Sequence, residues 1–405
     1  MISQKKSIVY VAREIERAFG MAPDADYSII TNKTPYAETV QKQYPEHVKL
    51  IENPGDELLD TAELLQHAAA SKLMPADSQV VVFKNNPQIE AVVKTNGWTL
   101  LNPSAEIAER IENKITQVEW LGPLAEKYLP KHIVGLTKEI SWNKEPLVIQ
   151  WAHGHTGDGT ILVNSDVELD VLKKQFPDRM ARASAYAHGP AFTVNVVVTA
   201  DIVLMGNISY QITGLPPFTD NPFSTVGNDW SLTHSLLSDI EIQYIEAMVA
   251  ETGAKIQTDG WRGLFGIDLI RDDEHDRICL IEINARQPAS ATFESFLQEG
   301  NRLEGLVGPT VFEAHIAALR GEAIHEALIP LNDGAQIVQR VTKNSGLKIE
   351  DSKLNALKEA GYKVISYPNT ELNADLLRIQ GTRGIMETHG KFNARGKEIV
   401  EIVSK

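Results

Sequence analysis

The segment between Gly263 and Arg286 constrains this chain more than any other, because it has the pattern of a charged β-hairpin. Apolar residues alternate along it as far as Ile270, a charged turn follows at 272–276, and a second apolar run reaches Ile283. Side chains two residues apart in a strand point to the same face. The pattern therefore predicts two antiparallel strands whose polar side chains gather on one side.

Four polar side chains of this hairpin are the candidates for chemistry. Glu282, Asn284 and Arg286 project together from the second strand, and a turn centred near 274–275 places Asp268 opposite residue 281 or 282. Two carboxylates and an amide oxygen suit Mg2+. Arg286 beside them would stabilise negative charge on a reacting acyl or phosphoryl group. A charged hairpin edge that discourages aggregation is the alternative, and spacing alone leaves both open.

Residues 260–290, GWRGLFGIDLIRDDEHDRICLIEINARQPAS, resemble the metal-binding core of the ATP-grasp superfamily. The shared pattern is an acidic residue on one strand, here Asp268, and Glu-x-Asn-x-Arg on the next, here 282–286. The resemblance implies ATP as cofactor and two Mg2+ ions bridging its phosphates, with Glu282 shared between them. It implies an α/β and α+β fold class, the ATP-grasp fold with an N-terminal parallel-sheet α/β domain and a small C-terminal α+β domain.

Three domains are expected along the chain. Residues 1–105 alternate strand-like and helix-like segments, which favours a parallel sheet. Residues 106–330 form the predicted ATP-grasp domain, with a β-rich lobe carrying the phosphate loop at 146–215. Residues 331–405 form the α+β domain. A helix that begins after Ser104 as its N-cap is expected to continue through Lys114.

The candidate nucleotide site combines a glycine-rich loop, a lysine and a hinge. A strand at 146–150 leads into the loop WAHGHTGDGT at 151–160, whose backbone N–H groups could close on phosphates. From the residues alone, an ordinary glycine-rich hairpin loop is an open alternative. The resemblance implies that the phosphates are bound by Lys114, Gln150, Gly154, Thr156, Gly157, Gly159 and Thr160. It implies that the adenine lies against Ala185, Tyr186 and Ala187.

Gln150 departs from the pattern of the family. Members of the superfamily usually have a lysine there, whereas glutamine can donate a hydrogen bond but brings no charge. Replacement of Gln150 by lysine is therefore expected to tighten ATP binding. His153 and His155 could suggest zinc, but the spacing offers no third ligand.

The composition of the chain disfavours some classes of binding partner. The net charge of −15 disfavours a general nucleic-acid or anionic-membrane surface. No stretch approaches the ~20 apolar residues that span a bilayer, and the N-terminus lacks a hydrophobic signal core. The one cysteine, Cys279, lies in a strand pattern and is expected to be buried. We expect a cytoplasmic protein that acts on small molecules; a homodimer is an open alternative to a monomer.

The resemblance implies an ATP-dependent ligase. A carboxylate substrate would be activated as an acyl-phosphate and joined to an amine substrate in an amide or peptide-like bond, with release of ADP and phosphate. Arg286 would stabilise the oxyanion. Two alternatives remain: a carboxylase like biotin carboxylase, and a non-catalytic nucleotide-binding protein. The second is suggested by Gln150 and by the lack of an acidic residue between 184 and 200 to hold the ribose.

Overall fold

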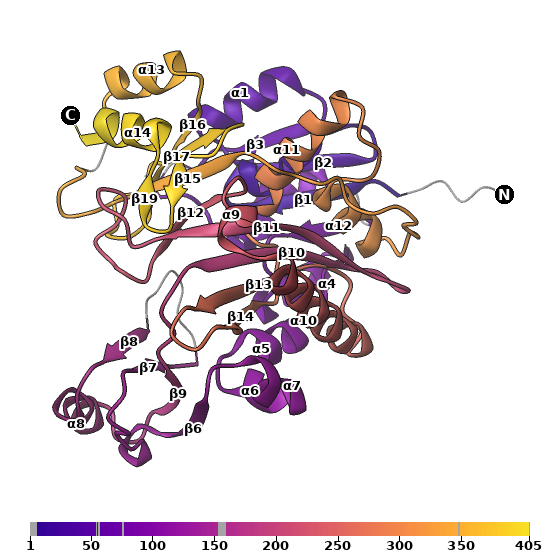
Figure 1. Ribbon diagram of the computed structural model, residues 1–405. Helices are drawn as coiled ribbons and strands as arrows, with labels where there is room; N and C mark the ends of the chain where they lie inside the picture. Colours follow the sequence, from indigo (N-terminus) through magenta and orange to yellow (C-terminus); the bar gives the residue numbers. More distant parts are fainter. Residues whose placement is uncertain are drawn as a thin grey trace.

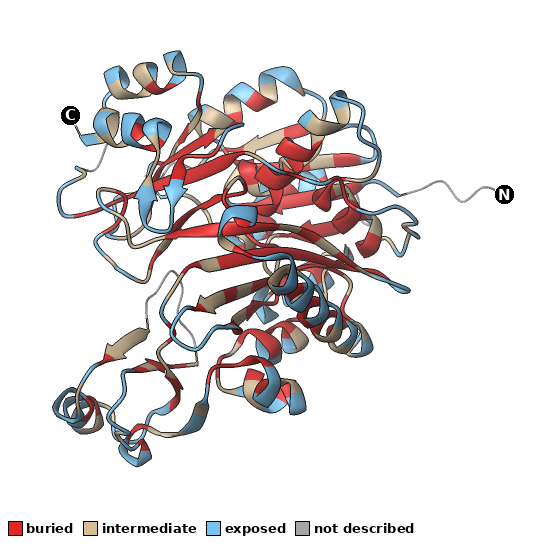
Figure 2. Cartoon of the chain, viewed as in Figure 1, coloured by how far each residue is buried: buried red, intermediate tan, exposed pale blue. Residues whose placement is uncertain are grey.

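The computed structural model describes residues 6–53, 55, 57–74, 77–152, 159–346 and 349–404. Its described part contains three larger sheets and the two-stranded sheet β18-β19. A five-stranded parallel sheet, an eight-stranded antiparallel sheet and a four-stranded antiparallel sheet follow one another in Figure 1, the last forming a lobe at the bottom of the view. Buried residues concentrate in the two larger sheets (Figure 2). In the part of the chain that the structure describes, no helix has both the length and the apolar character that a membrane crossing requires.

The N-terminal parallel sheet has the strand order β3-β2-β1-β4-β5. Its central strand β1 is buried at every position, because its alternate side chains enter two different cores on the two faces of the sheet. Phe312, from much later in the chain, stacks on Tyr10 of one face. The elements are β1 Ile8–Ala12, β2 Tyr27–Asn32, α1 Pro35–Gln43, β3 Val48–Ile51, α2 Thr61–Gln66, α3 Ala68–Leu73, β4 Gln79–Val82, α4 Pro87–Thr95 and β5 Thr99–Leu100.

The eight-stranded sheet is the centre of the molecule, in the order β14-β13-β10-β11-β12-β15-β17-β16. The strands predicted for the C-terminal α+β part continue this sheet, since β12 pairs with β15. Helix α10 packs into the core on one face, and α12 packs against β10 and β13. The elements are β10 Ala191–Val198, β11 Val203–Thr213, β12 Thr225–Asp229, α9 Thr233–Leu236, α10 Asp239–Thr258, β13 Gly263–Asp272, β14 Arg277–Asn284, α11 Ala291–Leu303, α12 Val311–Leu319, β15 Ala335–Arg340, α13 Asp351–Glu359, β16 Lys363–Ser366, β17 Asp375–Gly381, β18 Met386–Thr388, β19 Lys391–Phe392 and α14 Ala394–Ser404.

The small lobe has the strand order β6-β9-β7-β8 and its own apolar core around Trp151 and Leu169. It therefore includes a strand before residue 146, whereas β10 and β11, inside the range 146–215, belong to the large sheet. The elements are β6 His132–Leu136, β7 Leu147–Gln150, β8 Thr160–Val163, α8 Asp166–Gln175 and β9 Met180–Ala185.

The helix expected to carry Lys114 is interrupted, so that prediction is wrong. Ser104 caps α5, Ala105–Glu112, as predicted. The helix ends at Asn113, whose side-chain oxygen accepts a hydrogen bond from the backbone N–H of Ile115 at 3.0 Å. Two further short helices follow, α6 Thr116–Leu121 and α7 Pro123–Tyr128. Lys114 lies in the bend between α5 and α6, where its side chain is buried.

Candidate nucleotide and metal site

The hairpin predicted from the sequence is formed by β13 and β14. Asp268 lies opposite Glu282, and Gly266 opposite Asn284, in the predicted register. Just beyond Asp268 the register shifts, so that Ile281 has no partner across the pair. The bulge turns the main chain of β14 at the residue before Glu282, and it leaves the carbonyl of Ile281 available to another group.

Asp268 is a half-buried carboxylate surrounded by donors. Its Oδ1 accepts hydrogen bonds from Thr193 Oγ1 at 2.8 Å and from Gln211 Nε2 at 2.8 Å, and its Oδ2 accepts one from Asn284 Nδ2 at 2.9 Å. Burial raises the pKa of Asp268 to about 6, and the neighbouring charge of Glu282 acts in the same direction. Two carboxylates are thus held side by side, and their mutual repulsion destabilises the charged form of Asp268. A cation bound between them would remove this repulsion.

Lys114 and Glu282 form an ion pair across this site. The Nζ of Lys114 lies 2.9 Å from the Oε1 of Glu282, and their side chains are 5% and 21% exposed. The backbone N–H of Lys114 also donates to the carbonyl of Ala152, at the start of the glycine-rich loop. One buried lysine therefore connects the bend after α5, the hairpin and the loop.

Arg286 is held by two polar neighbours on the other side of the hairpin. Its Nη2 donates to Asn284 Oδ1 at 2.9 Å, and its Nε donates to Glu112 Oε1 at 3.1 Å. Glu112, at the end of α5, also pairs with Lys84 at 2.9 Å. A continuous chain of side chains thus runs from Asp268 through Asn284 and Arg286 to Glu112.

This end of the site reaches the N-terminal sheet at the point where its strand order reverses, between β1 and β4. The guanidinium carbons of Arg17 and Arg286 lie 5.0 and 5.7 Å from the centre of the Phe83 ring. Gln287, next to Arg286, accepts a hydrogen bond from Tyr10 and donates one to the carbonyl of Arg17. Ligand sites in parallel sheets commonly lie at such a reversal.

The strand ends of the predicted nucleotide site lie together. Gln150 and Thr160 are paired across β7 and β8, and Gly159 before Thr160 has a φ of +79°, which favours glycine. The other candidates in the loop lie outside the described residues: Gly154, Thr156, Gly157, and with them His153 and His155.

The hinge predicted to hold the adenine joins β9 to β10. The backbone N–H of Ala185 donates to Lys131 O at 2.8 Å, and that of Tyr186 donates to Pro146 O at 3.0 Å. Both groups are therefore occupied within the protein. Ala187 is buried, and it is the residue of the three that we infer to offer its backbone to an adenine edge.

The donor set fits Mg2+ better than a transition metal. Within the described ranges, no three His, Cys, Asp or Glu side chains are grouped as a metal site. Asn284 turns its NH2 group to Asp268 and its oxygen to Arg286. Among the described residues, the two carboxylates of Asp268 and Glu282 suit a hard cation that takes its other ligands from phosphates and water. The oxygen of Asn284, the third predicted ligand, accepts a hydrogen bond from Arg286 in this structure.

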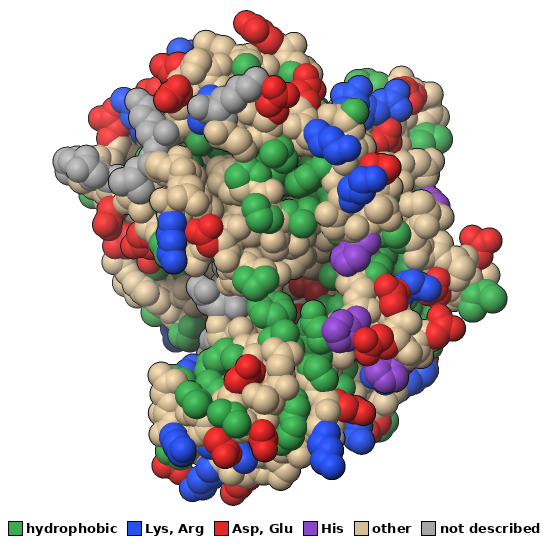
Figure 3. Space-filling model, turned by 60° about the vertical axis from the view of Figure 1, so that its left-hand side comes forward, with side chains coloured by type: hydrophobic (Ala, Val, Ile, Leu, Met, Phe, Trp, Pro, Cys, Tyr) green, Lys and Arg blue, Asp and Glu red, His purple; other side chains and the backbone are tan. Residues whose placement is uncertain are grey.

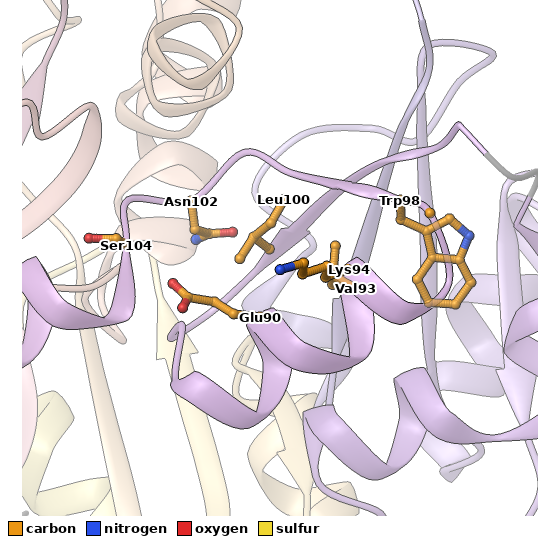
Figure 4. Close-up of a pocket in the computed structure, with 8 residues that line it drawn as sticks. Glu90, Val93, Lys94, Trp98, Leu100, Asn102 and Ser104 are labelled. Carbon is orange, nitrogen blue, oxygen red and sulfur yellow. The ribbon is translucent and has the colours of Figure 1, made fainter.

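Figure 3 shows a hollow above the small lobe with acidic side chains recessed in it. A different, shallow pocket lies between α4 and β5 (Figure 4). Its carboxylate, Glu90, is already used, because Oε1 accepts from Asn85 Nδ2 at 2.9 Å and from the backbone N–H of Ala105 at 2.7 Å. These bonds attach the start of α5 to α4, so the pocket has a structural explanation.

Comparison with known proteins supports the assignment of the hairpin. Residues 111–290 match the model of the ATP-grasp domain. The chain contains an ATP-grasp domain. This range holds β6 to β14 together with Lys114, the small lobe and all four polar residues of the hairpin. The predicted superfamily is therefore confirmed. No curated protein sequence matches the chain.

Solved structures resemble the chain over nearly its whole length. An N5-carboxyaminoimidazole synthase from Aspergillus clavatus, solved with ADP and 5-aminoimidazole ribonucleotide, shares 16% identity at a TM-score of 0.67, covering 99% of this chain and 100% of that one. An L-amino acid ligase from Bacillus licheniformis shares 13% identity at 0.61, covering 99% and 97%. A phosphoribosylamine–glycine ligase from Thermotoga maritima shares 13% at 0.60, covering 98% and 96%. These likenesses confirm the predicted fold class.

Several side chains of the site were not predicted from the sequence. Thr193 supports Asp268 from β10, and Glu112 supports Arg286 from α5. Each is a common polar residue in a strand or helix without a recognisable motif. Its place beside the hairpin depends on how the elements pack, which the sequence pattern does not show. A buried arginine, Arg182, also reaches the site from β9.

Proposed function

We propose that this protein is an ATP-dependent ligase that activates a carboxylate as an acyl-phosphate and joins it to an amine. The observation that supports this most directly is the placement of Asp268 and Glu282 opposite each other on neighbouring strands, with Lys114 on one side and Arg286 on the other. Opposed carboxylates beside buried cations suit the binding of a metal–triphosphate complex.

In this proposal Asp268 and Glu282 hold Mg2+, two ions in the complete complex. Magnesium would neutralise the transferring phosphoryl group and align it with the attacking oxygen. Glu282 would hold the metal in place of its bond to Lys114, and the ammonium of Lys114 would then contact a phosphate. Asn284 orients the pair of Asp268 and Arg286, since it bonds to both.

Arg286 would act at the reacting centre. Its guanidinium would bind the carboxylate or its acyl-phosphate and stabilise the oxyanion formed when the amine attacks. Glu112 holds this guanidinium in place, and the rings and charges between β1 and β4 border the same space. We therefore propose that the carboxylate and amine substrates enter between the N-terminal sheet and the hairpin, with the nucleotide between the hairpin and the small lobe.

N-carboxylation of an amine is a second candidate. It is favoured by the whole-chain likeness to an N5-carboxyaminoimidazole synthase, whose name describes a carboxy group on a nitrogen. In that reaction bicarbonate would take the place of the carboxylate, and the roles of Asp268, Glu282 and Arg286 would be unchanged.

A coupled assay of ADP release tests these reactions. Amino acids, dipeptides and bicarbonate are each offered with a panel of amines in the presence of Mg2+ and ATP, and products are identified by mass spectrometry. We expect ADP release that needs both a carboxylate and an amine, and a product with one new C–N bond. ATP binding without turnover across the whole panel would instead support a non-catalytic nucleotide-binding protein.

Glu282→Gln is the matched variant for this assay. It keeps the size of the side chain and an acceptor for Lys114, but removes the charge that a metal needs. We expect Mg2+-dependent ADP release to fall to background while the circular dichroism spectrum is retained. A fully active variant would contradict the assignment of Glu282.

A further inference from the structure

Arg182 is a buried cation that the chemistry of the hairpin does not use. It lies on β9 and is 2% exposed. The three oxygens to which it donates are all neutral: Gln150 Oε1, Gln117 Oε1 and Ile281 O. Within the described part of the chain its Nε has no hydrogen-bond partner. An arginine whose hydrogen bonds all go to neutral acceptors is costly to bury. The nearby charge of Glu282 offsets part of that cost, and an anionic ligand beside Arg182 would offset more of it.

The position of Arg182 relates it to the nucleotide site. Arg182 lies directly opposite Gln150 in the pairing of β9 with β7. Its Nη2 donates to Gln150 Oε1 at 2.7 Å and to the carbonyl of Ile281, the bulged residue before Glu282, at 2.9 Å. Arg182 thus bridges the small lobe and the metal hairpin. Burial lowers its pKa to about 10, so the guanidinium is charged at neutral pH.

Arg182 also fixes which way the amide of Gln150 faces. A guanidinium has only donors, so Gln150 must turn its oxygen toward Arg182. The NH2 group of Gln150 then faces the other way, and its Nε2 lies 3.4 Å from the Oγ1 of Thr160 on β8. The NH2 group of Gln150 therefore faces Thr160, where the glycine-rich loop joins β8.

We propose that Gln150 and Arg182 together form one phosphate contact, in which Gln150 binds a phosphate oxygen through its NH2 group and Arg182 supplies the charge behind it. This rests on the proposed nucleotide site. Gln150 is the binding residue, whereas Arg182 is a positioning residue that acts through the amide. The pair places a cation near the phosphates without exposing it to solvent.

The proposal reverses one expectation drawn from the sequence. A lysine at 150 would face the guanidinium of Arg182 and could accept no hydrogen bond from it. Gln150→Lys is therefore expected to weaken ADP binding. Combined with Arg182→Met, which removes the opposing charge, the same lysine is expected to restore it. This reciprocal rescue is specific to the pair.

The test measures the affinities of the full chain for Mg2+–ADP and for adenosine by calorimetry. Arg182→Met is expected to weaken ADP binding about tenfold to a hundredfold, because the amide of Gln150 loses its orientation and with it a hydrogen bond to the charged phosphate. Adenosine affinity should not change, because adenosine lacks the phosphates. Gln150→Met should give the same selective loss, and it serves as the second variant if Arg182→Met does not fold.

Arg320→Met is the matched control. Arg320 also donates to backbone carbonyls, those of Lys6 and Asp26, and its Nε likewise lacks a partner in the described structure. It lies at the end of α12 and should leave both affinities unchanged.

The outcomes separate the two proposals. Equal loss of ADP and adenosine affinity in Arg182→Met, or no loss in either variant at residues 150 and 182, would overturn the phosphate contact. The nucleotide site would stand in that case if Glu282→Gln still abolished the Mg2+ dependence of ADP binding. A wild-type chain that binds neither ATP nor ADP would overturn both.

Discussion

The ion pair between Lys114 and Glu282 gives a quantitative test of how the site changes when it binds its ligands. At 2.9 Å the gross attraction is about 6 kcal/mol for an effective dielectric constant of about 20. Desolvation of both groups offsets much of this, and loss of one partner of a buried pair costs about 3–5 kcal/mol. We therefore expect Lys114→Met and Glu282→Gln each to destabilise the metal-free protein, with the glutamine milder because it keeps an acceptor.

A double-mutant cycle isolates the pair. In EDTA, urea unfolding of the four proteins should give a coupling free energy of about 2 kcal/mol, since the residues are in direct contact. Fluorescence and circular dichroism transitions must coincide for the cycle to be valid. With saturating Mg2+ and ADP the coupling should fall to about 0.5 kcal/mol or less, the level of independent sites, because Glu282 turns to the metal and Lys114 to a phosphate.

An exposed pair provides the control for this cycle. Lys127 and Glu251 lie 2.7 Å apart with side chains 48% and 40% exposed, and exposed pairs contribute less than about 1 kcal/mol. Lys127→Met and Glu251→Gln should couple weakly with and without ligand. The reasoning is refuted if the Lys114–Glu282 coupling is the same in both conditions, or if it is absent in EDTA.

Two predictions concern how stability varies with pH. Burial raises the pKa of Glu294 from 4.5 to about 6, so the stability from its protonated form is present below pH 4.5 and is lost as the pH rises through 6. The unfolding free energy of wild type relative to Glu294→Gln should fall by about 2 kcal/mol between pH 4.5 and 7.5; parallel profiles would contradict this. Burial lowers the pKa of His315 from 6.5 to about 3, so its contribution is present above pH 6.5 and is lost on acidification. The Nδ1 of His315 accepts from the backbone N–H of Leu264, and His315→Asn, which keeps an acceptor there, should be less acid-labile in pH-dependent melting; equal acid sensitivity of the two proteins would count against it.

The sequence was sufficient to predict the hairpin because strand periodicity and register are local properties. The alternation on both sides of a charged turn places Asp268 opposite residue 281 or 282, and the structure pairs it with Glu282. The start of the helix after Ser104 is predicted correctly, but its end is not. Asn113 ends the helix through a side-chain hydrogen bond, and the spacing of apolar residues gives no sign of such a bond. Strand β1 has no alternation to detect, because both of its faces are buried.

The rest of the site depends on sheet order, which a single sequence does not contain. Arg182 appears in the sequence as one arginine among small residues of a strand. Its importance follows only when β9 is placed beside β7 and opposite Gln150. Glu112 and Thr193 are likewise ordinary until their elements are packed against the hairpin. The expectation that lysine at 150 tightens ATP binding considers this position alone, without its neighbour Arg182 across the strand pair.

The pairing of charges in the site explains how a protein with a net charge of −15 can bind a triphosphate. Among the described residues, three carboxylates and four cations line it: Asp268, Glu282 and Glu112, and Lys84, Lys114, Arg182 and Arg286. These residues carry one positive charge in excess, and Arg182 is the cation whose hydrogen bonds all go to neutral oxygens. Three of these cations are paired with carboxylates, and in the proposed site Mg2+ would displace one of them, Lys114, from Glu282. Nucleotide affinity should for this reason depend strongly on Mg2+, because the metal would both neutralise the phosphates and free Lys114 to bind them.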